Sequence, residues 1–215
     1  MSHRRFTLVA VVCALVVAGH ARAADDPLKP IEDQSGLPRV LLIGDSISIG
    51  YTLPTRKLLD GKANVHRIPA NSGTTANTLK HLDKWLGDGH WDVIHMNIGL
   101  HDLKYVQGQR QVGPDDYEQN LRQIVARLKK TGAKIIWATT TPVPEGAAAR
   151  NPGDEVKYNA IAAKVMAEEE IPINDLYALA KEHQAEWQRK ANVHFKPAGS
   201  EGLARRVADE ILKAL

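Results

Sequence analysis

Hydrophobic positions along the chain follow two patterns that alternate from residue 39 onward. Short runs rich in Val, Ile and Leu predict buried strands, and longer segments with apolar residues at helical spacing predict helices. The predicted strands cover residues 40–43, 65–68, 91–97, 134–138 and 171–174. The predicted helices cover residues 53–59, 75–86, 115–130, 155–170, 176–189 and 200–214.

The segment 115–130 shows the helical pattern most clearly. Its apolar stripe consists of Leu121, Ile124, Val125 and Leu128. Lys129, Lys130 and then Gly132 follow, and basic residues ahead of a glycine are typical of a helix C-terminus. This segment is therefore predicted to lay one apolar face on a sheet.

The alternation of strands and helices predicts an α/β fold, because parallel strands are usually joined by crossover helices. We expect a three-layer αβα sandwich on a flavodoxin-like five-stranded parallel sheet with strand order 2-1-3-4-5. Residues 24–38 are predicted to form an irregular lead-in, and residues 39–215 one domain. Residues 141–153, which include three prolines, are predicted to form a long loop at the carboxyl edge of the sheet.

The first 23 residues have the pattern of a secretory signal peptide. A basic start is followed by an apolar stretch over residues 6–19 and by the small-residue cleavage pattern Ala21-Arg22-Ala23. The single cysteine, Cys13, lies inside this segment, so the mature chain is expected to contain no disulfide. We expect export to the periplasm or the extracellular space, with stability that depends on a packed core.

The net charge argues against nucleic acid as a partner. The precursor carries 28 Lys and Arg against 25 Asp and Glu. Residues 1–23 contain Arg4, Arg5 and Arg22 and no acidic residue, so the mature chain has equal numbers of bases and acids. A nucleic-acid-binding domain needs a dense basic face, which this composition does not supply.

Two segments far apart in the chain suggest nucleophilic catalysis. Ser46 follows a buried strand directly, in Gly44-Asp45-Ser46, and His194 lies near the C-terminus in the segment 193–199. A serine hydroxyl is a poor nucleophile at neutral pH unless a base takes its proton, and histidine commonly does so. Alternatively, Asp45 simply caps a helix after an ordinary turn, and His194 is a surface histidine.

Two further loop segments complete a recognisable set. They are Asn71-Ser72-Gly73 after the second predicted strand and Gly99-Leu100-His101-Asp102 after the third. With these four segments in this order, the chain resembles the SGNH/GDSL hydrolase family from about residue 40 to the C-terminus. That family comprises esterases, lipases and carbohydrate deacetylases with a three-layer αβα fold.

The resemblance implies a role for each segment. Ser46 would be the nucleophile and His194 the base that takes its proton. The N–H groups of Ser46 and Gly73, together with His101, would stabilise the oxyanion. Without the resemblance, Asn71-Ser72-Gly73 is equally typical of a turn before a helix.

The chain departs from the family pattern in the third segment. His101 stands where the family has asparagine, and a neutral histidine offers one N–H donor where an amide offers two. Loss of an oxyanion donor costs ~10²–10³ in rate, so this replacement matters. Asp102 is expected either to hold the loop or to fix the tautomer of the histidine, and His101 itself is alternatively a structural loop residue.

The fourth segment departs as well. Ala191 stands where the family has the aspartate that supports the catalytic histidine, and Asn192 is closer to His194 but carries no charge. The support of His194 is left open between a backbone carbonyl, which would give a Ser–His dyad, an acid from elsewhere such as Asp102, and no partner.

No metal or organic cofactor is expected. The spacings between His81, His90 and His95 do not match the close pairs typical of zinc sites, and His95 on the third strand is better explained as a buried, hydrogen-bonded side chain. In the proline-containing loop, Arg150 and Asn151 are candidates to contact a polar or anionic sugar, or else belong to an exposed linker. The tryptophans are expected in or near the core.

These observations predict an exported serine esterase that hydrolyses small acyl esters. The acyl group is expected to be acetyl and the substrate a small-molecule or carbohydrate ester. One alternative is a non-catalytic carbohydrate-binding relative, suggested by the two departures at His101 and Ala191. Another is a lysophospholipase or thioesterase with the same mechanism. The natural ester and the oligomeric state are left open by the sequence.

Overall fold

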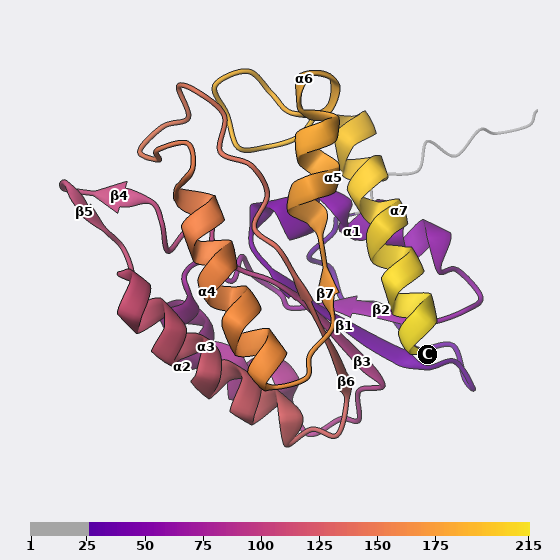
Figure 1. Cartoon of the computed structure of the whole chain (residues 1–215). Helices are drawn as coiled ribbons and strands as arrows, with labels where there is room; N and C mark the ends of the chain where they lie inside the picture. The colour runs from indigo at the N-terminus through magenta and orange to yellow at the C-terminus, as the bar shows by residue number, and fades with distance from the viewer. Residues whose placement is uncertain (1–25) are drawn as a thin grey trace, which may run out of the picture.

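The computed structural model describes residues 26–215 as a sheet covered by helices on both faces (Figure 1). The predicted signal peptide, its cleavage pattern and Cys13 lie outside the described residues. No helix in residues 26–215 has the length and apolar character needed to span a membrane.

The main sheet has five parallel strands in the order β2-β1-β3-β6-β7. Their bounds are β1 Arg39–Gly44, β2 Asn64–Arg67, β3 Val93–Asn97, β6 Lys134–Ala138 and β7 Ile173–Asn174. Among these strands the order along the chain is 2-1-3-4-5, so the predicted topology is confirmed. Parallel strands buried on both faces are typically continuous apolar runs, which is why their positions were visible in the sequence.

Seven helices cover the sheet within residues 26–215. Their bounds are α1 Ser46–Leu58, α2 Thr75–Leu86, α3 Pro114–Lys129, α4 Asp154–Glu168, α5 Leu176–Glu182, α6 Gln184–Trp187 and α7 Pro197–Ala214. On one side α1 packs against α7, which also contacts α5, and on the other side α2, α3 and α4 pack in sequence (Figure 1).

Helix α1 begins earlier than expected. The pattern predicted its start at residue 53, whereas the helix begins at Ser46. Gly50 obscured the first two turns, since glycine is a poor helix former. The helix is started instead by Asp45, whose side chain accepts a hydrogen bond from the Ile47 N–H at 2.9 Å, and by burial of residues on its inner face.

Two further differences concern short elements. The predicted helix over residues 176–189 is two helices, α5 and α6, separated at His183. A two-stranded antiparallel hairpin, β4 Tyr105–Val106 and β5 Gln109–Arg110, was not predicted. Its turn places Gln107 and Gly108 at φ angles of 51° and 78°, as two-residue hairpin turns of this hand require.

The core lies on both faces of the sheet and is mainly apolar, with buried polar side chains among its residues. His95 on β3 is fully buried, and its Nε2 lies 3.1 Å from the Asn174 Nδ2, as expected for a hydrogen-bonded core histidine. Trp91 and Trp137 are buried, and Trp85 and Trp187 pack against the core, in agreement with the structural interpretation of the tryptophans.

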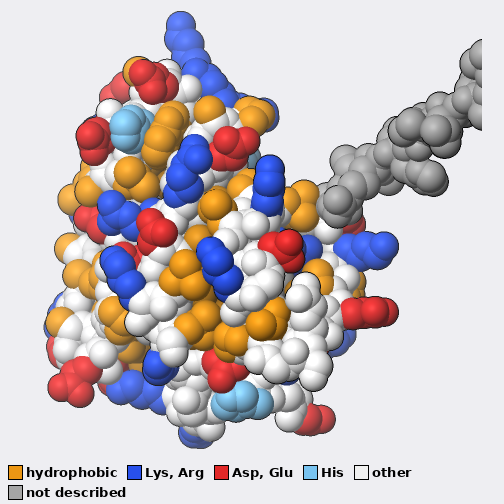
Figure 2. Space-filling model, turned by 90° about the vertical axis from the view of Figure 1, so that its right-hand side faces the viewer, with side chains coloured by type: hydrophobic (Ala, Val, Ile, Leu, Met, Phe, Trp, Pro, Cys, Tyr) orange, Lys and Arg blue, Asp and Glu red, His pale blue; other side chains and the backbone are white. Residues whose placement is uncertain are grey.

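The outer face formed by α1 and α7 carries basic, acidic and apolar side chains interspersed with one another (Figure 2). No dense basic surface is visible on this face, which agrees with the charge balance of the mature chain.

Candidate active site

Ser46 lies at the carboxyl edge of the sheet, as the first residue of α1. Strand β1 ends at Gly44, and Asp45 turns the chain into the helix. The turn is tight: a Cβ atom on Gly44 would lie 2.5 Å from the Ser48 Cβ and 2.9 Å from the Asn97 carbonyl oxygen. A side chain at residue 44 would therefore displace the serine loop.

The buried Arg67, at the end of β2, is hydrogen-bonded to this loop. Its Nη1 donates to Ser48 Oγ at 2.6 Å, and its Nη2 donates to the carbonyl oxygens of Gly44 and Asp45 at 2.8 and 3.2 Å. Burial lowers the pKa of Arg67 to about 10, so the guanidinium remains charged at neutral pH. The strand register, which pairs Leu42 with Arg67, brings the arginine under the turn.

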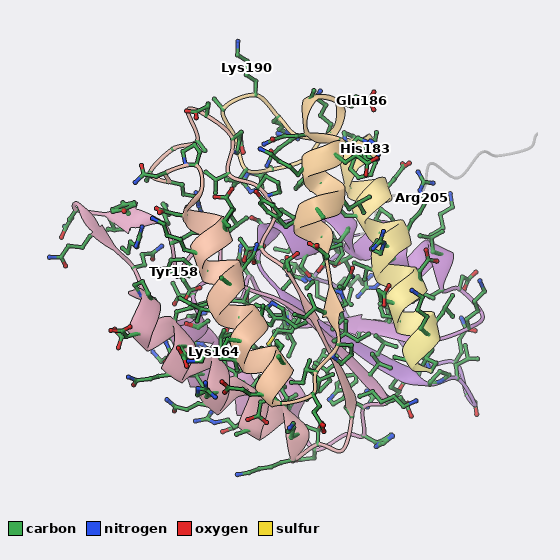
Figure 3. All side chains as sticks on the ribbon, viewed as in Figure 1. Tyr158, Lys164, His183, Glu186, Lys190 and Arg205 are labelled. Carbon is green, nitrogen blue, oxygen red and sulfur yellow. The ribbon has the colours of Figure 1, made fainter. Side chains whose placement is uncertain are left out.

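His194 is brought to Ser46 from the opposite end of the chain. The distance between His194 Nε2 and Ser46 Oγ is 2.9 Å, which is a hydrogen bond. The segment that carries His194 folds back on itself: Gln188 and Phe195 form an antiparallel bridge, and the Arg189 N–H donates to the His194 carbonyl oxygen at 3.0 Å. Lys190 projects outward from the same loop (Figure 3).

Asn192 orients the histidine ring. Its Oδ1 lies 2.7 Å from His194 Nδ1 and also accepts the backbone N–H of His194 at 3.0 Å. Because this amide oxygen only accepts, Nδ1 carries the ring proton and Nε2 is left free to accept from the Ser46 hydroxyl. Of the supports considered for His194, neither a backbone carbonyl nor Asp102 occupies this position.

The Gly73 loop lies beside the serine loop. The Ser72 N–H donates to the Gly44 carbonyl oxygen at 3.0 Å, which joins the two loops. The Gly73 N–H donates to Asn71 Oδ1 at 2.9 Å. Asn77 Nδ2, in the first turn of α2, donates to the Ser72 carbonyl oxygen at 2.7 Å and secures the loop from the helix side.

The third loop follows Asn97, the last residue of β3. The Asn97 Nδ2 donates to the carbonyl oxygens of Ala138 and Thr139 at 3.2 and 3.1 Å, at the end of β6. Gly99 has a φ of 154°, and a Cβ there would lie 2.1 Å from Thr140 Oγ1, so this position requires glycine. His101 follows and is partly buried. Burial, assisted by the charges of Arg150 and Lys104, lowers the pKa of His101 to about 4, so its ring is neutral at pH 7.

Asp102 is buried and acts on the start of α2. Its Oδ1 accepts from the Thr75 N–H at 2.9 Å and from Thr75 Oγ1 at 2.5 Å, and Asn120 Nδ2 donates to the same hydroxyl. Burial raises the pKa of Asp102 to about 7. Of the two roles expected for Asp102, holding the loop agrees with these contacts.

A cavity of about 600 Å³ opens beside Ser46 between α1 and α7. Its lining is mixed, with apolar side chains next to the two site residues and with charged groups farther along. The lining residues are Ser46, Ile47, Ile49, Gly50, Pro54, Arg189, His194, Phe195, Pro197, Ser200 and Glu201. The cavity is larger than an acetyl group requires, so it has room for a bulkier part of a ligand.

Within residues 26–215, no three His, Cys, Asp or Glu side chains gather closely enough to hold a metal ion. The chemistry available at the site is that of a serine hydroxyl, a neutral imidazole, backbone N–H donors and nearby arginines. Such a set suits attack on a carbonyl carbon.

The four sequence segments predicted to meet do lie on neighbouring loops at one edge of the sheet. Ser46 and His194 are hydrogen-bonded to each other, and the Gly73 loop is bonded to the serine loop. Two contributors were missed. Arg67 was visible only as a charged residue inside an apolar strand, and Asn192 was set aside because it carries no charge.

Comparison with known proteins identifies the family of the chain. The model of the GDSL-like Lipase/Acylhydrolase family matches residues 42–201. An arylesterase from Vibrio mimicus is 26% identical over 188 residues, which covers 82% of this chain and 90% of the relative.

Solved structures agree on the fold. A lipase/acylhydrolase from Enterococcus faecalis superposes with a TM-score of 0.72 at 20% identity, covering 81% of this chain and 95% of its own. A catalytic mutant of an acetylxylan esterase from Geobacillus stearothermophilus has a TM-score of 0.70 at 21% identity, covering 84% of this chain and 96% of its own.

Proposed function

The chain belongs to the GDSL-like lipase/acylhydrolase family and is a carboxylic ester hydrolase, and from this premise we propose that Ser46 is its nucleophile and that its substrates are esters of small acyl groups. The observation that supports the assignment of the nucleophile is the 2.9 Å hydrogen bond between Ser46 Oγ and His194 Nε2. A serine and a histidine separated by most of the chain meet in the geometry of a nucleophile and its base.

In the first half of the proposed reaction, Ser46 Oγ attacks the ester carbonyl carbon while its proton passes to His194 Nε2. The C=O bond becomes a C–O⁻ single bond in a tetrahedral intermediate. The intermediate then collapses, the bond to the alcohol oxygen breaks, and the leaving oxygen takes the proton from Nε2. This leaves the acyl group on Ser46 and releases a neutral alcohol.

In the second half, water replaces the alcohol. His194 Nε2 takes a proton from water as the water oxygen attacks the acyl carbon. Collapse of the second intermediate breaks the bond to Ser46 Oγ, which regains its proton from Nε2. A carboxylic acid leaves, and Ser46 and His194 return to their starting states.

Three donors are proposed to stabilise the oxyanion. The Ser46 N–H belongs to the first turn of α1, where helix N–H groups have no partner within the helix and the helix dipole favours negative charge. The neutral His101 supplies one ring N–H. The Gly73 N–H is bonded to Asn71 Oδ1, so it would have to share or exchange that bond in order to contribute.

Asn192 explains how His194 could act as the base although the aspartate of the family is absent. It fixes the tautomer in which Nε2 accepts the serine proton, which is the role whose loss is most damaging when a triad acid is replaced. It does not stabilise the positive charge that develops on the ring. The proposed enzyme therefore has a correctly oriented but uncharged support for its base.

The proposed acyl group is acetyl and the proposed alcohol part a larger molecule, including sugars. An acetylxylan esterase is among the structural neighbours, and an arylesterase is among the relatives. The cavity beside Ser46 has room for a ring-sized alcohol, and its charged lining residues Arg189 and Glu201 disfavour a long fatty chain. These features favour a small-acyl esterase over a lysophospholipase or thioesterase.

The proposal is tested by the hydrolysis of p-nitrophenyl acetate by residues 24–215. Ser46→Ala is expected to lower kcat by at least about 10³-fold, because removal of a catalytic serine leaves only binding and oxyanion stabilisation. Ser35→Ala, which removes an exposed hydroxyl in the lead-in before β1, serves as the matched control. Equal rates for Ser46→Ala and the unaltered protein would exclude Ser46 as the nucleophile.

A further inference from the structure

Arg150 is fixed against the third loop of the site. Its Nε donates to the Leu100 carbonyl oxygen at 2.8 Å, directly before His101, and its Nη1 lies 3.4 Å from the Ala148 carbonyl oxygen. The loop that carries it is anchored from the hairpin side as well, because the Tyr105 N–H donates to the Ala149 carbonyl oxygen at 2.8 Å. The guanidinium is therefore held in place before any ligand arrives.

The Arg150 guanidinium forms no ion pair with the residues that the structure describes, and both of its hydrogen bonds are to neutral carbonyl oxygens. Several other arginines in residues 26–215 do form ion pairs: Arg39 with Asp33, Arg110 with Asp154, Arg122 with Glu118 and Glu168, and Arg127 with Asp83. The buried Arg67 is bonded, like Arg150, to neutral oxygen atoms. A partly buried guanidinium without an ion pair gains from binding an anion.

The charge of Arg150 acts on both sides of Ser46. Burial raises the pKa of Asp45, the residue before Ser46, and the charges of Arg67 and Arg150 partly oppose this rise. Burial lowers the pKa of His101, and the charge of Arg150 lowers it further. Lys104 acts on His101 in the same direction, and Arg189 lines the cavity that also contains Ser46. A ligand whose carbonyl lies at Ser46 would therefore meet the positive charges of Arg150, Lys104 and Arg189 as well as the negative charge of Glu201.

We propose that Arg150 binds a carboxylate of the substrate, so that the preferred substrates are small-acyl esters that carry a carboxylate near the scissile bond. This inference rests on the proposed function. Acetylated hydroxy acids and acetylated acidic sugars have this chemistry, as do half-esters of dicarboxylic acids. The first two carry the carboxylate on the alcohol part, and the last carries it on the acyl part.

The geometry of arginine suits this role. Nε donates to the Leu100 carbonyl oxygen, and Nη1 has only a long contact of 3.4 Å with the Ala148 carbonyl oxygen, so the Nη end is the one that can meet a ligand. A guanidinium presents a planar, permanently charged fork that matches a carboxylate. Because the loop already fixes the side chain, little rotamer entropy is lost when the carboxylate binds.

The test uses two pairs of esters, each a carboxylate and its methyl ester, and compares the preference within a pair between enzyme variants. The first pair is 4-acetoxybenzoate and its methyl ester, with the carboxylate on the alcohol part. The second is mono-4-nitrophenyl adipate and its methyl ester, with the carboxylate on the acyl part. The measured quantity is the ratio of kcat/KM for the charged member to that for the methyl ester, at low ionic strength.

We expect the unaltered enzyme to prefer the charged member of at least one pair, and that pair identifies the side on which the carboxylate binds. Arg150→Gln keeps a donor for the Leu100 carbonyl oxygen and removes the charge, so it is expected to lower the preference by about tenfold to hundredfold through KM. The kcat/KM for the methyl ester should fall much less than that for the charged member, because the methyl ester offers Arg150 no carboxylate. Arg150→Lys should retain part of the preference. Arg206→Gln, an exposed arginine on α7, is the control and should change nothing.

Three outcomes would overturn the inference while leaving the esterase intact. They are no preference for either charged ester in the unaltered enzyme, an unchanged preference in Arg150→Gln, and an equal loss of kcat on both members of a pair. The last would make Arg150 a positioning residue for the His101 loop. Failure of the proposed function has a different signature, because hydrolysis of every ester would then be independent of Ser46.

Discussion

Asn192 uses one oxygen for two hydrogen bonds, one to the backbone of His194 and one to its ring. The backbone bond requires an acceptor at this position, which identifies the atom facing the ring as oxygen. An aspartate at this position would both orient the His194 ring and place a negative charge beside it. Asn192 orients the ring without adding the charge. The contribution of each can be measured by changing this one residue.

Asn192→Leu is expected to lower kcat for p-nitrophenyl acetate by about 10²–10⁴-fold, because nothing would then fix the proton on Nδ1. Asn192→Asp keeps the acceptor and adds a charge that stabilises the imidazolium formed during attack, so kcat should be equal to or higher than that of the unaltered enzyme. Steady-state kinetics of both variants check this. A normal kcat in Asn192→Leu would show that the ring needs no support.

At the scale of residues, the sequence identified the groups whose chemistry is visible from their type. Ser46 and His194 stand in recognisable segments, and they meet in the structure. Arg67 and Asn192 were not identified. The function of Arg67 depends on the register between β1 and β2, which no local pattern contains, and that of Asn192 depends on a turn that directs its oxygen at the ring.

Among the elements, α2 is joined to the site by the bond between Asp102 and Thr75 at its first residue. The Gly73 loop lies directly before this helix. Thr74 caps this helix through the Asn77 N–H, and the carboxyl group of Asp102, from a distant loop, accepts from the N–H of its first residue in addition. Because burial raises the pKa of Asp102 to about 7, its protonation changes in the neutral range.

This shift gives a stability prediction with a definite sign. The folded carboxyl retains its proton up to about pH 7, whereas in the unfolded chain it ionises near 3.8. Between these values the folded state binds more protons, so the contribution of Asp102 to the free energy of unfolding falls as pH rises from about 4 to 7. Asp102→Asn does not titrate and should therefore become more stable relative to the unaltered protein over this interval.

Urea unfolding at pH 4.5, 6 and 7.5 measures the effect as the difference between the two proteins, which cancels the titration of all other groups. Asp116→Asn, at an exposed acid in the first turn of α3, is the matched control and should show no comparable trend. A difference between Asp102→Asn and the unaltered protein that is constant with pH would mean that Asp102 is ionised throughout.

Element prediction succeeded where burial and local pattern agreed, as for α2, β6 and the stripe of α3. It failed where a local rule was overridden. The start of α1 contains Gly50, and its helical state is imposed by the Asp45 cap and by packing on β1 and α7. The hairpin β4–β5 is too short to show any alternation.

For the whole molecule, the parallel sheet explains why residues from four distant segments meet at one edge. The right order of strands could be predicted because crossover helices leave few alternatives. Export, by contrast, depends on residues 1–23, whose structure lies outside the described part, and it is argued from sequence pattern alone.

We propose that residues 1–23 direct export and are then removed. Expression of the full chain in a Gram-negative host should place the protein in the osmotic-shock fraction, with an intact mass that corresponds to a first residue of Ala24. An Arg4→Glu, Arg5→Glu variant should be retained in the cytoplasm with the segment still attached. Full-length protein in the shock fraction would contradict cleavage at this position.

The hydrogen bonds from Arg67 to the serine turn have a consequence for engineering by recombination. The turn that carries Ser46 is hydrogen-bonded to the side chain of Arg67 on the neighbouring strand, about twenty residues later in the chain. In a recombined protein, the turn and this strand should therefore come from the same parent. A chimera whose crossover point falls inside α1 would pair the serine turn of one parent with the second strand of the other. Crossovers placed after residue 68 would keep the turn and the strand together, and libraries built in that way should contain more active members.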